Sequence, residues 1–320
     1  MHIPDGFLDL KTCLGSYCAA GAGLTLAMRR IRASGSDKTV PLLGVMSAFL
    51  FAGQTVNFPI GSGISGHLLG STLAAIVLGP SGAALVVATV LLVQCVLFQD
   101  GGITTFGANF LNLGLVGVGT GYFVFQFLAR WVRSARGLVL PAAIASWFSA
   151  LCAAVACAIE LAGAGTVKLP VILPPLLVAH AVIGLGEAAI TAAMISFLAR
   201  VRPDLILRPH QAAVRAAAPE PLNWAHVLCG LAFALGIALL AAPFASTLPD
   251  ALEAVAARLN FQDRAAAFWP APLADYTLPG SAPEWLAVSL AVGCGTALTF
   301  VLILGLARWL RRPRSESHAE

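Results

Sequence analysis

The stretch GAALVVATVLLVQCVLF, residues 82–98, decides the fold class, because it is almost entirely apolar and carries no charged side chain. A helix needs about 20 apolar residues to cross a bilayer, and fewer where neighbouring helices bury it. Similar segments recur along the chain, which has 58% hydrophobic and only 11% charged residues. Soluble domains carry about 25% charged residues. The sequence therefore predicts an all-α, polytopic helical membrane protein.

On either side of this stretch, the hydropathy pattern predicts further apolar spans. All the predicted spans, with the first included, lie near residues 12–28, 40–53, 64–79, 82–98, 107–129, 138–160, 173–199, 224–243 and 285–307. After the seventh span, a stretch rich in Pro, Ala and Arg is typical of a linker. We therefore expect a seven-helix bundle at 1–205, a linker at 206–223 and a unit of two additional transmembrane helices at 224–320. The loop of that unit, 243–284, is long enough to have a function of its own.

The basic residues indicate how the chain crosses the membrane. If the N-terminus lies outside, all but four of the 19 lysines and arginines fall in cytoplasmic segments. The four exceptions are Lys11, Lys168, Arg258 and Arg264. Basic residues are enriched in cytoplasmic loops. We therefore expect a multi-pass protein of the cell (inner) membrane, with an extracytoplasmic N-terminus, a cytoplasmic linker and a cytoplasmic C-terminus.

The N-terminal sequence MHIPDGFLDL, residues 1–10, has the donor groups of a transition-metal chelate. It lacks the pattern of an ordinary signal peptide, and we expect Met1 to remain because the large His2 hinders its removal. A free α-amine, the His2 amide nitrogen and the His2 imidazole can close adjacent five- and six-membered rings around one ion. Nitrogens in one plane suit Ni(II) or Cu(II) rather than zinc or magnesium. The alternative is that His2 is an ordinary interfacial residue.

A fourth nitrogen is available from His67. The preceding segment QTVNFPIGSGISGH, residues 54–67, is too rich in Pro and Gly for a continuous helix. Irregular backbone at membrane depth persists only where it is buried in protein or lines a cavity. In the expected topology this segment lies on the same face as His2. Protonation should weaken such a site as the pH falls through about 6.5, the value of a free imidazole.

Several polar side chains fall inside the apolar spans, where polar groups are costly. They are Gln94, Asn109, Asn112, His180 and Glu187. His180 and Glu187 are seven positions apart, so they lie near one face of a helix. An ionisable residue inside a membrane is a functional candidate. The alternative is an interhelical hydrogen bond that fixes packing.

Four sequence blocks stand in order along the chain: MHIPDGFL at 1–8, GSGISGHLLG at 61–70, VQCVLFQDGGITTFGANFLNLG at 93–114 and HAVIGLGEAAIT at 180–191. Together they resemble the cobalt/nickel-specific substrate-binding membrane subunit of energy-coupling-factor (ECF) transporters. The resemblance implies a seven-helix, metal-binding unit with an external N-terminus. It also implies that the Met1 amine, the His2 amide and imidazole, and the His67 imidazole hold the metal. Residues that could orient these ligands are Asn57, Ser65, Gln94, His180 and Glu187.

Residues 224–320 resemble the small auxiliary PDGLE-type subunit of the same systems, fused here to the first. The motif is present as LPDALE at 248–253, with Ala251 where glycine is usual, and a second block is PLADYTLPG at 272–280. The resemblance implies a transmembrane coupling subunit and two cytoplasmic ATPases as partners. No GxxxxGK[ST] motif occurs in the chain, so ATP hydrolysis is expected on those partners.

The function that we expect is substrate capture for an ECF-type, ATP-driven nickel or cobalt uptake transporter. Ni²⁺ or Co²⁺ is the transported substrate, and the surroundings are the lipid bilayer; neither an organic cofactor nor a nucleic acid is expected. One alternative is a stand-alone secondary divalent-metal permease, which would need inverted repeats and a polar pathway that we do not find in the sequence. A second is a membrane enzyme, but no HExxH motif occurs.

Overall fold

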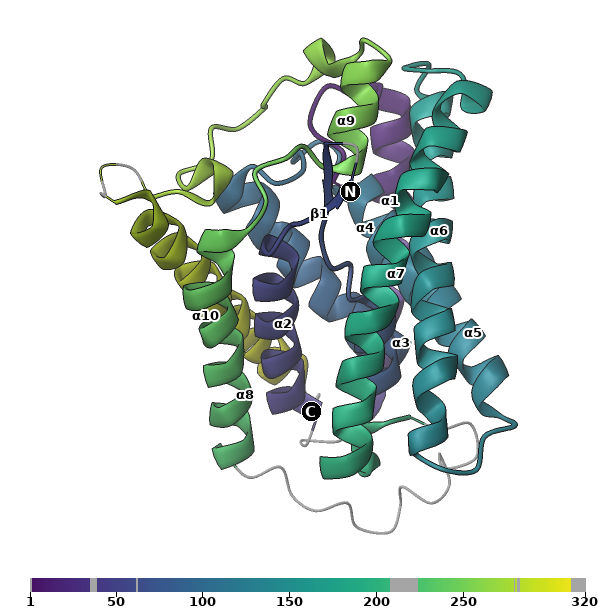
Figure 1. Cartoon of the computed structure of the whole chain (residues 1–320), viewed down its shortest axis with the longest axis vertical. Helices are drawn as coiled ribbons and strands as arrows, with labels where there is room; N and C mark the ends of the chain where they lie inside the picture. The colour runs from purple at the N-terminus through teal and green to yellow at the C-terminus, as the bar shows by residue number, and fades with distance from the viewer. Residues whose placement is uncertain are drawn as a thin grey trace, which may run out of the picture.

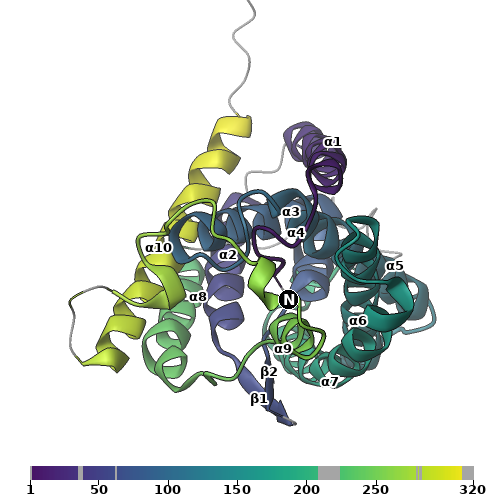
Figure 2. The same cartoon turned by 90° about the horizontal axis from the view of Figure 1, so that it is seen from above.

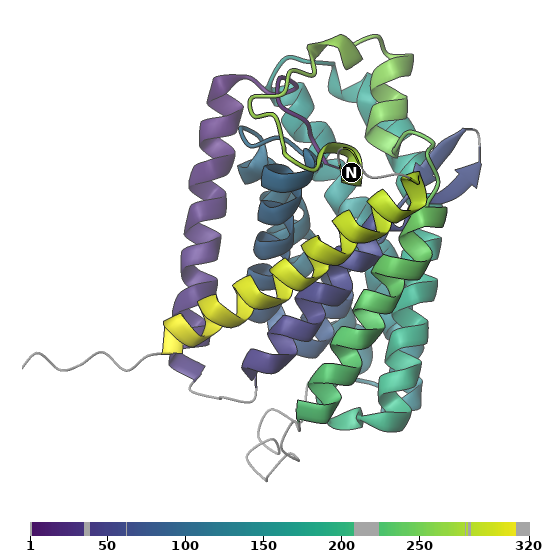
Figure 3. The ribbon, with the colours of Figure 1, turned by 90° about the vertical axis from the view of Figure 1, so that its left-hand side faces the viewer.

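The computed structural model describes residues 2–34, 39–61, 63–207, 224–278, 280 and 283–311, and it is mostly helical. Most long helices run along the longest axis of the molecule (Figure 1), and α10 crosses at a slant (Figure 3). Among the described residues, six segments are long and apolar enough to cross a membrane. They are Ser71–Phe98, Phe106–Ala129, Arg136–Gly163, Leu169–Val201, Trp224–Phe244 and Glu284–Leu310. They confirm a polytopic helical protein, while the count of nine spans stays a prediction.

Two further helices precede these segments. α1 (Leu10–Ser34) is long but less apolar, and α2 (Thr39–Thr55) is apolar but short. The α-helices that follow are α3 (Ser71–Val93), α4 (Phe106–Phe110), α5 (Val118–Ala129), α6 (Val139–Gly163), α7 (Leu169–Val201), α8 (Trp224–Gly236), the short α9 (Ala251–Arg258) between two spans, and α10 (Glu284–Arg311). π-Helical turns follow α3, α4 and α8, at Gln94–Phe98, Leu111–Gly117 and Ile237–Ala241. α3 lies at the centre, since 78% of its apolar window is buried.

The predicted span at 64–79 is wrong in its first half. Strands β1 (Phe58–Gly61) and β2 (Ile64–Gly66) form a short antiparallel hairpin, which also departs from the all-α prediction. The helix begins only at Ser71, after Gly70 with φ 74°. The physical reason is the glycine-rich sequence, which disfavours helix and supplies the left-handed residues that the turns require. α3 is itself broken at Gly79 (φ 77°, ψ 166°), before Pro80, near the boundary predicted between two spans.

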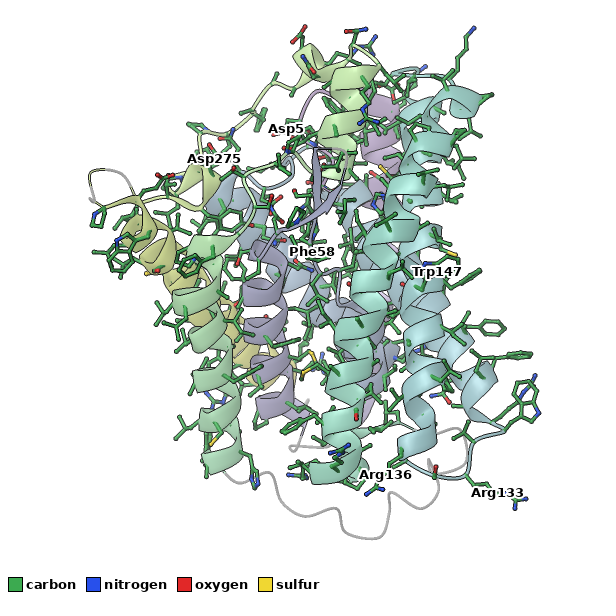
Figure 4. The ribbon with its side chains drawn as sticks, viewed as in Figure 1. Asp5, Phe58, Arg133, Arg136, Trp147 and Asp275 are labelled. Atoms are coloured by element: carbon green, nitrogen blue, oxygen red, sulfur yellow. The ribbon has the colours of Figure 1, made fainter. Side chains whose placement is uncertain are left out.

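Four charged side chains mark the two ends of the molecule. Asp5 and Asp275 lie at one end, called here the site end, and Arg133 and Arg136 lie at the opposite end (Figure 4). The predicted linker, residues 206–223, lies mostly outside the described residues.

The second unit packs on the first and covers its site end. α8 and α10 contact α2, and the segment between them passes over the bundle (Figure 2). A Cβ at Gly295 of α10 would lie 2.2 Å from the Phe51 ring of α2, so this close approach requires glycine. Residues 245–278, called here the cap segment, therefore lie above the N-terminal residues.

Candidate metal centre

His2 and His67 lie together at the site end. Both are buried, and their rings are stacked with centroids 5.2 Å apart and planes 13° apart. Each ring carries a nitrogen that could bind a metal ion at about 2 Å. Met1, the third residue of the predicted ligand set, lies outside the described residues. In the described part of the chain, no group of three or more His, Cys, Asp or Glu side chains could hold a metal ion.

The His67 ring is oriented by its own main chain. Its Nδ1 lies 3.0 Å from the carbonyl oxygen of Leu68, so Nδ1–H donates there and Nε2 keeps the lone pair that a metal needs. Burial lowers the pKa of His67 to about 3. This corrects the expectation of a transition near pH 6.5 for this ring, because a buried imidazolium loses its hydration. His67 is therefore neutral at physiological pH.

The His2 ring is held by a carboxylate. His2 Nδ1 lies 2.6 Å from Asp100 Oδ1, and the Tyr276 hydroxyl donates to Asp100 Oδ2 at 2.5 Å. Burial alone would raise the pKa of Asp100, but the charge and hydrogen bond of His2 outweigh it and hold that pKa below its usual value. His2 Nε2 is buried and has no hydrogen-bond partner among the described residues.

The residue after His2 is clamped by its main chain. Ile3 donates its N–H to Asn109 Oδ1 at 2.8 Å, and its carbonyl accepts from Asn109 Nδ2 at 3.0 Å. The same carbonyl accepts from the Gly102 N–H and the Thr105 hydroxyl. These bonds fix where the N-terminal segment enters the bundle, and they therefore fix His2.

Asp5 joins three parts of the chain. Its Oδ1 accepts from the N–H and the hydroxyl of Thr104, and its Oδ2 accepts from the Phe268 N–H. Its carbonyl also accepts from the Ala266 N–H at 2.9 Å. The N-terminal segment, the turn before α4 and the cap segment are thereby tied together.

The loop that carries His67 is held from below by buried polar side chains. Glu187 accepts from the two successive main-chain N–H groups of Leu69–Gly70, at 2.7 and 2.8 Å. Gln54 donates to the Leu69 carbonyl, and Gln94 donates to Gln54 Oε1 at 3.0 Å. Glu187 and Gln94 thus act on the backbone of this loop, and no described contact joins them to the two rings.

Of the other residues predicted to orient the ligands, two contact the cap segment and one bonds within its own helix. Ser65 contacts the cap segment, because its N–H and hydroxyl donate to the carbonyls of residues 249 and 248 at 2.9 and 2.7 Å. The Asn57 carbonyl accepts from the Ser246 N–H. His180 Nδ1 pairs with a carbonyl of the preceding turn of α7. Ser65 and Asn57 therefore dock the cap segment, whereas the described hydrogen bond of His180 is internal to its helix.

Sequence reasoning gave no site role to Asp100, Tyr276 or Asn109. The signal for Asp100 is its turn, in which Gln99 (φ 59°) and Gly101 (φ 84°) are both left-handed. Such a turn is readable from the sequence. Its partners His2 and Tyr276 are 98 and 176 residues away, and no local pattern predicts those contacts.

Comparison with known proteins decides the family. The profile of CbiM, the cobalt uptake substrate-specific transmembrane region, matches residues 2–205. This chain belongs to that family. The profile of the PDGLE domain matches residues 224–312. The resemblance found in the sequence is thus confirmed for both parts of the chain, which is a multi-pass membrane protein of an ECF-type cobalt/nickel transport family.

Relatives share the fused arrangement. A protein of Archaeoglobus fulgidus, provisionally named as a fused nickel transport protein NikMN, is 37% identical over 314 residues, 97% of this chain and 99% of that protein. The fused nickel transport protein NikMN of Rhodobacter capsulatus is 34% identical over 235 residues, 69% of this chain and 67% of that protein. A crystal structure of a truncated transition metal transporter, 32% identical, covers 63% of this chain and 99% of its own, with a TM-score of 0.58.

Proposed function

We propose that this CbiM-family chain is the substrate-capture subunit of an ECF-type, ATP-driven uptake transporter for Ni²⁺ or Co²⁺. The metal is the transported substrate, and it binds through the Met1 amine, the His2 amide and imidazole, and the His67 imidazole. The observation that carries the proposal is the buried His2–His67 pair, with ring centroids 5.2 Å apart. Two buried imidazoles beside the start of the chain are what an N-terminal chelate needs.

The chelate makes a specific demand on His2. A six-membered ring through the His2 amide uses Nδ1, and the amide must lose its proton when the metal binds. In the structure Nδ1 pairs with Asp100. Metal binding therefore exchanges Asp100 for the metal at Nδ1, and the proton moves to Nε2. In the structure Nε2 is buried and has no hydrogen-bond partner among the described residues.

The surrounding residues have supporting roles in this proposal. Glu187 and Gln94 hold the loop that presents His67, and Ser65 and Asn57 dock the cap segment over it. His180, whose described hydrogen bond lies within its own helix, supports packing.

The orientation and the partners complete the proposal. Arg133 and Arg136 lie at the end opposite the site (Figure 4), so the positive-inside rule favours a cytoplasmic position for them and an extracytoplasmic site. A transmembrane coupling subunit and two cytoplasmic ATPases would supply the energy, because the chain has no GxxxxGK[ST] motif.

The test is an alanine inserted between Met1 and His2. The insertion moves the imidazole out of the chelate and leaves every helix unchanged, so bound Ni or Co should fall from about one per chain to near zero by elemental mass spectrometry. The matched control is an alanine inserted between Ser134 and Ala135, at the opposite end, which should keep its metal. Equal metal in both variants would refute the N-terminal chelate.

Reconstitution separates capture from autonomous transport. Purified chain in vesicles should bind metal but take up none, even along a metal gradient, until the coupling subunit, the ATPases and ATP are added. Uptake by the chain alone would favour the secondary permease instead.

A further inference from the structure

We propose that Glu160 of α6 and Asn112 form a buried proton-binding site, in which Glu160 carries a proton and donates it to the side-chain oxygen of Asn112. The ligand is a single hydrogen ion held inside the bundle. No described contact joins this pair to His2 or His67, so the site lies outside the proposed metal chelate and its test is independent of that function.

Glu160 and Asn112 meet between two helical segments. Glu160 stands in the last turn of α6, and Asn112 stands in the π-helical turn Leu111–Gly117 that follows α4. Asn112 Nδ2 donates to Glu160 Oε2 at 2.7 Å, and only 1% of Asn112 and 8% of Glu160 is exposed. An ionisable side chain inside a membrane protein is a functional candidate, and π-helical turns are frequent at functional sites.

Each of the two side chains keeps a second oxygen without a partner. Asn112 Oδ1 and Glu160 Oε1 are both buried, and neither has a hydrogen-bond partner among the described residues. Each is bonded to the same carbon as one end of the Asn112–Glu160 hydrogen bond, so the two oxygens flank that bond. Both are acceptors as long as Glu160 is ionised. One proton on Glu160 Oε1 makes that atom a donor, and the acid and the amide then exchange two hydrogen bonds.

The charge around Glu160 also favours the protonated form. The ion pairs of the described residues do not include Glu160, and the nearest basic residue along the chain, Lys168, is exposed. The titratable side chains near it or on the helix packed against α6 are acids, thiols and one histidine: Asp5, Asp9, Cys13, Cys157, His180 and Glu187. The last two bond elsewhere. A buried carboxyl group without a cation beside it takes up a proton rather than remaining charged.

The proton joins α6 to the segment that holds the start of the chain. Asn112 follows Asn109 by three residues, and Asn109 clamps the Ile3 main chain. Loss of the proton would leave two buried acceptors without a donor and a negative charge without a counter-ion. The bound proton therefore stabilises the packing of the π-helical turn against α6.

The test is infrared spectroscopy of the purified full chain, with Glu160→Gln as the main variant. Glutamine presents the same groups as the protonated acid, one carbonyl oxygen and one donor, so it should keep both bonds to Asn112. At about pH 6, where exposed carboxyl groups are ionised, the unaltered chain should show the carbonyl stretch of a buried carboxylic acid. Glu160→Gln should lose that band, and Glu284→Gln, at the exposed start of α10, is the matched control and should keep it. Asn112→Leu should move the band to higher frequency, because the acid carbonyl loses its N–H donor.

Unfolding in detergent at several pH values supplies a second readout. Glu160 of the unfolded chain is ionised above about pH 4.3, so unfolding releases the proton. Between about pH 5 and 6.5, the folding equilibrium constant of the unaltered chain should fall about tenfold per pH unit relative to that of Glu160→Gln. His67 is present in both chains, so its own titration cancels in this ratio.

Three results would overturn the inference. If Glu160→Gln loses no acid band, the carboxyl group is ionised in the folded chain. If Glu160→Gln fails to fold or is less stable than the unaltered chain at about pH 5, a charged carboxylate rather than an acid completes the pair. If Na⁺ stabilises the unaltered chain, choline does not, and Glu160→Gln responds to neither, a cation occupies the place assigned to the proton.

Discussion

The Glu187 carboxylate of α7 accepts a hydrogen bond at 2.8 Å from the main-chain N–H of Gly70, at the start of α3. Together with its bond from the preceding N–H, this contact holds the backbone two and three residues after His67. A buried carboxylate at a helix N-terminus satisfies main-chain donors that have no other partner. The position of His67 therefore depends on a residue 120 positions later in the chain.

The first prediction concerns that carboxylate. Glu187→Gln leaves one acceptor oxygen and turns an NH₂ group towards a main-chain N–H, so we expect a loss of about 1.5–3 kcal/mol in unfolding free energy and weaker metal binding. Thermal unfolding in detergent and Ni²⁺ titration measure the two effects. Ser146→Ala, which removes a 3.4 Å contact to the same carboxylate and a 3.0 Å hydrogen bond with Thr191, is the control. A Glu187→Gln protein as stable as this control would refute the role of the carboxylate.

The second prediction concerns the clamp on Ile3. Asn109→Ala removes both side-chain bonds to the Ile3 main chain, so the N-terminal segment should loosen and metal affinity should fall about tenfold, in proportion to about 1.4 kcal/mol of lost hydrogen bonding. Asn112→Ala is the matched control, because Asn112 is an equally buried amide that bonds Glu160 instead. Hydrogen exchange at residues 2–7 should increase in the first variant and not in the second.

The third prediction is the dependence of folding on pH. Burial lowers the pKa of His67 to about 3 in the folded chain, whereas the unfolded value is about 6.5. Between these values the unfolded state binds a proton at His67 that the folded state does not. The free energy of unfolding is therefore unaffected by His67 above pH 6.5 and decreases as the pH falls below it. The loss approaches about 1.4 kcal/mol per pH unit.

His67→Gln isolates this contribution, because glutamine does not titrate. Without added metal, unfolding free energies of the unaltered chain should fall more steeply from pH 6.5 to 4 than those of His67→Gln. His226→Gln, at an exposed position of α8, is the control and should follow the unaltered chain. Equal slopes for the unaltered chain and His67→Gln would contradict a depressed pKa.

The sequence predicted the long helices well, because segments such as 82–98 are almost entirely apolar and carry no charge, which favours a helix in a membrane. It did not predict the hairpin at 58–66, since a Gly- and Pro-rich stretch indicates only the absence of helix. The chelate logic selected His2 and His67, and the structure brings them together. The shared helix face of His180 and Glu187 did not predict their partners. His180 bonds its own turn and Glu187 bonds the start of α3, and that difference is set by tertiary packing.

The last prediction is the orientation of the molecule in the membrane. Asp263 of the cap segment and Arg133 after α5 are both exposed. The cap segment covers the site end, and Arg133 lies at the opposite end (Figure 4). In a chain whose seven cysteines are replaced, single cysteines at these two positions report the two sides of the membrane. An impermeant thiol reagent on intact cells should label Asp263→Cys and should label Arg133→Cys only after the membrane is permeabilised. Both variants should still bind Ni²⁺, which shows that the labelled protein is folded. The reverse labelling pattern would place the His2–His67 pair in the cytoplasm, where capture of metal from outside is impossible, and it would therefore overturn the uptake function together with the orientation.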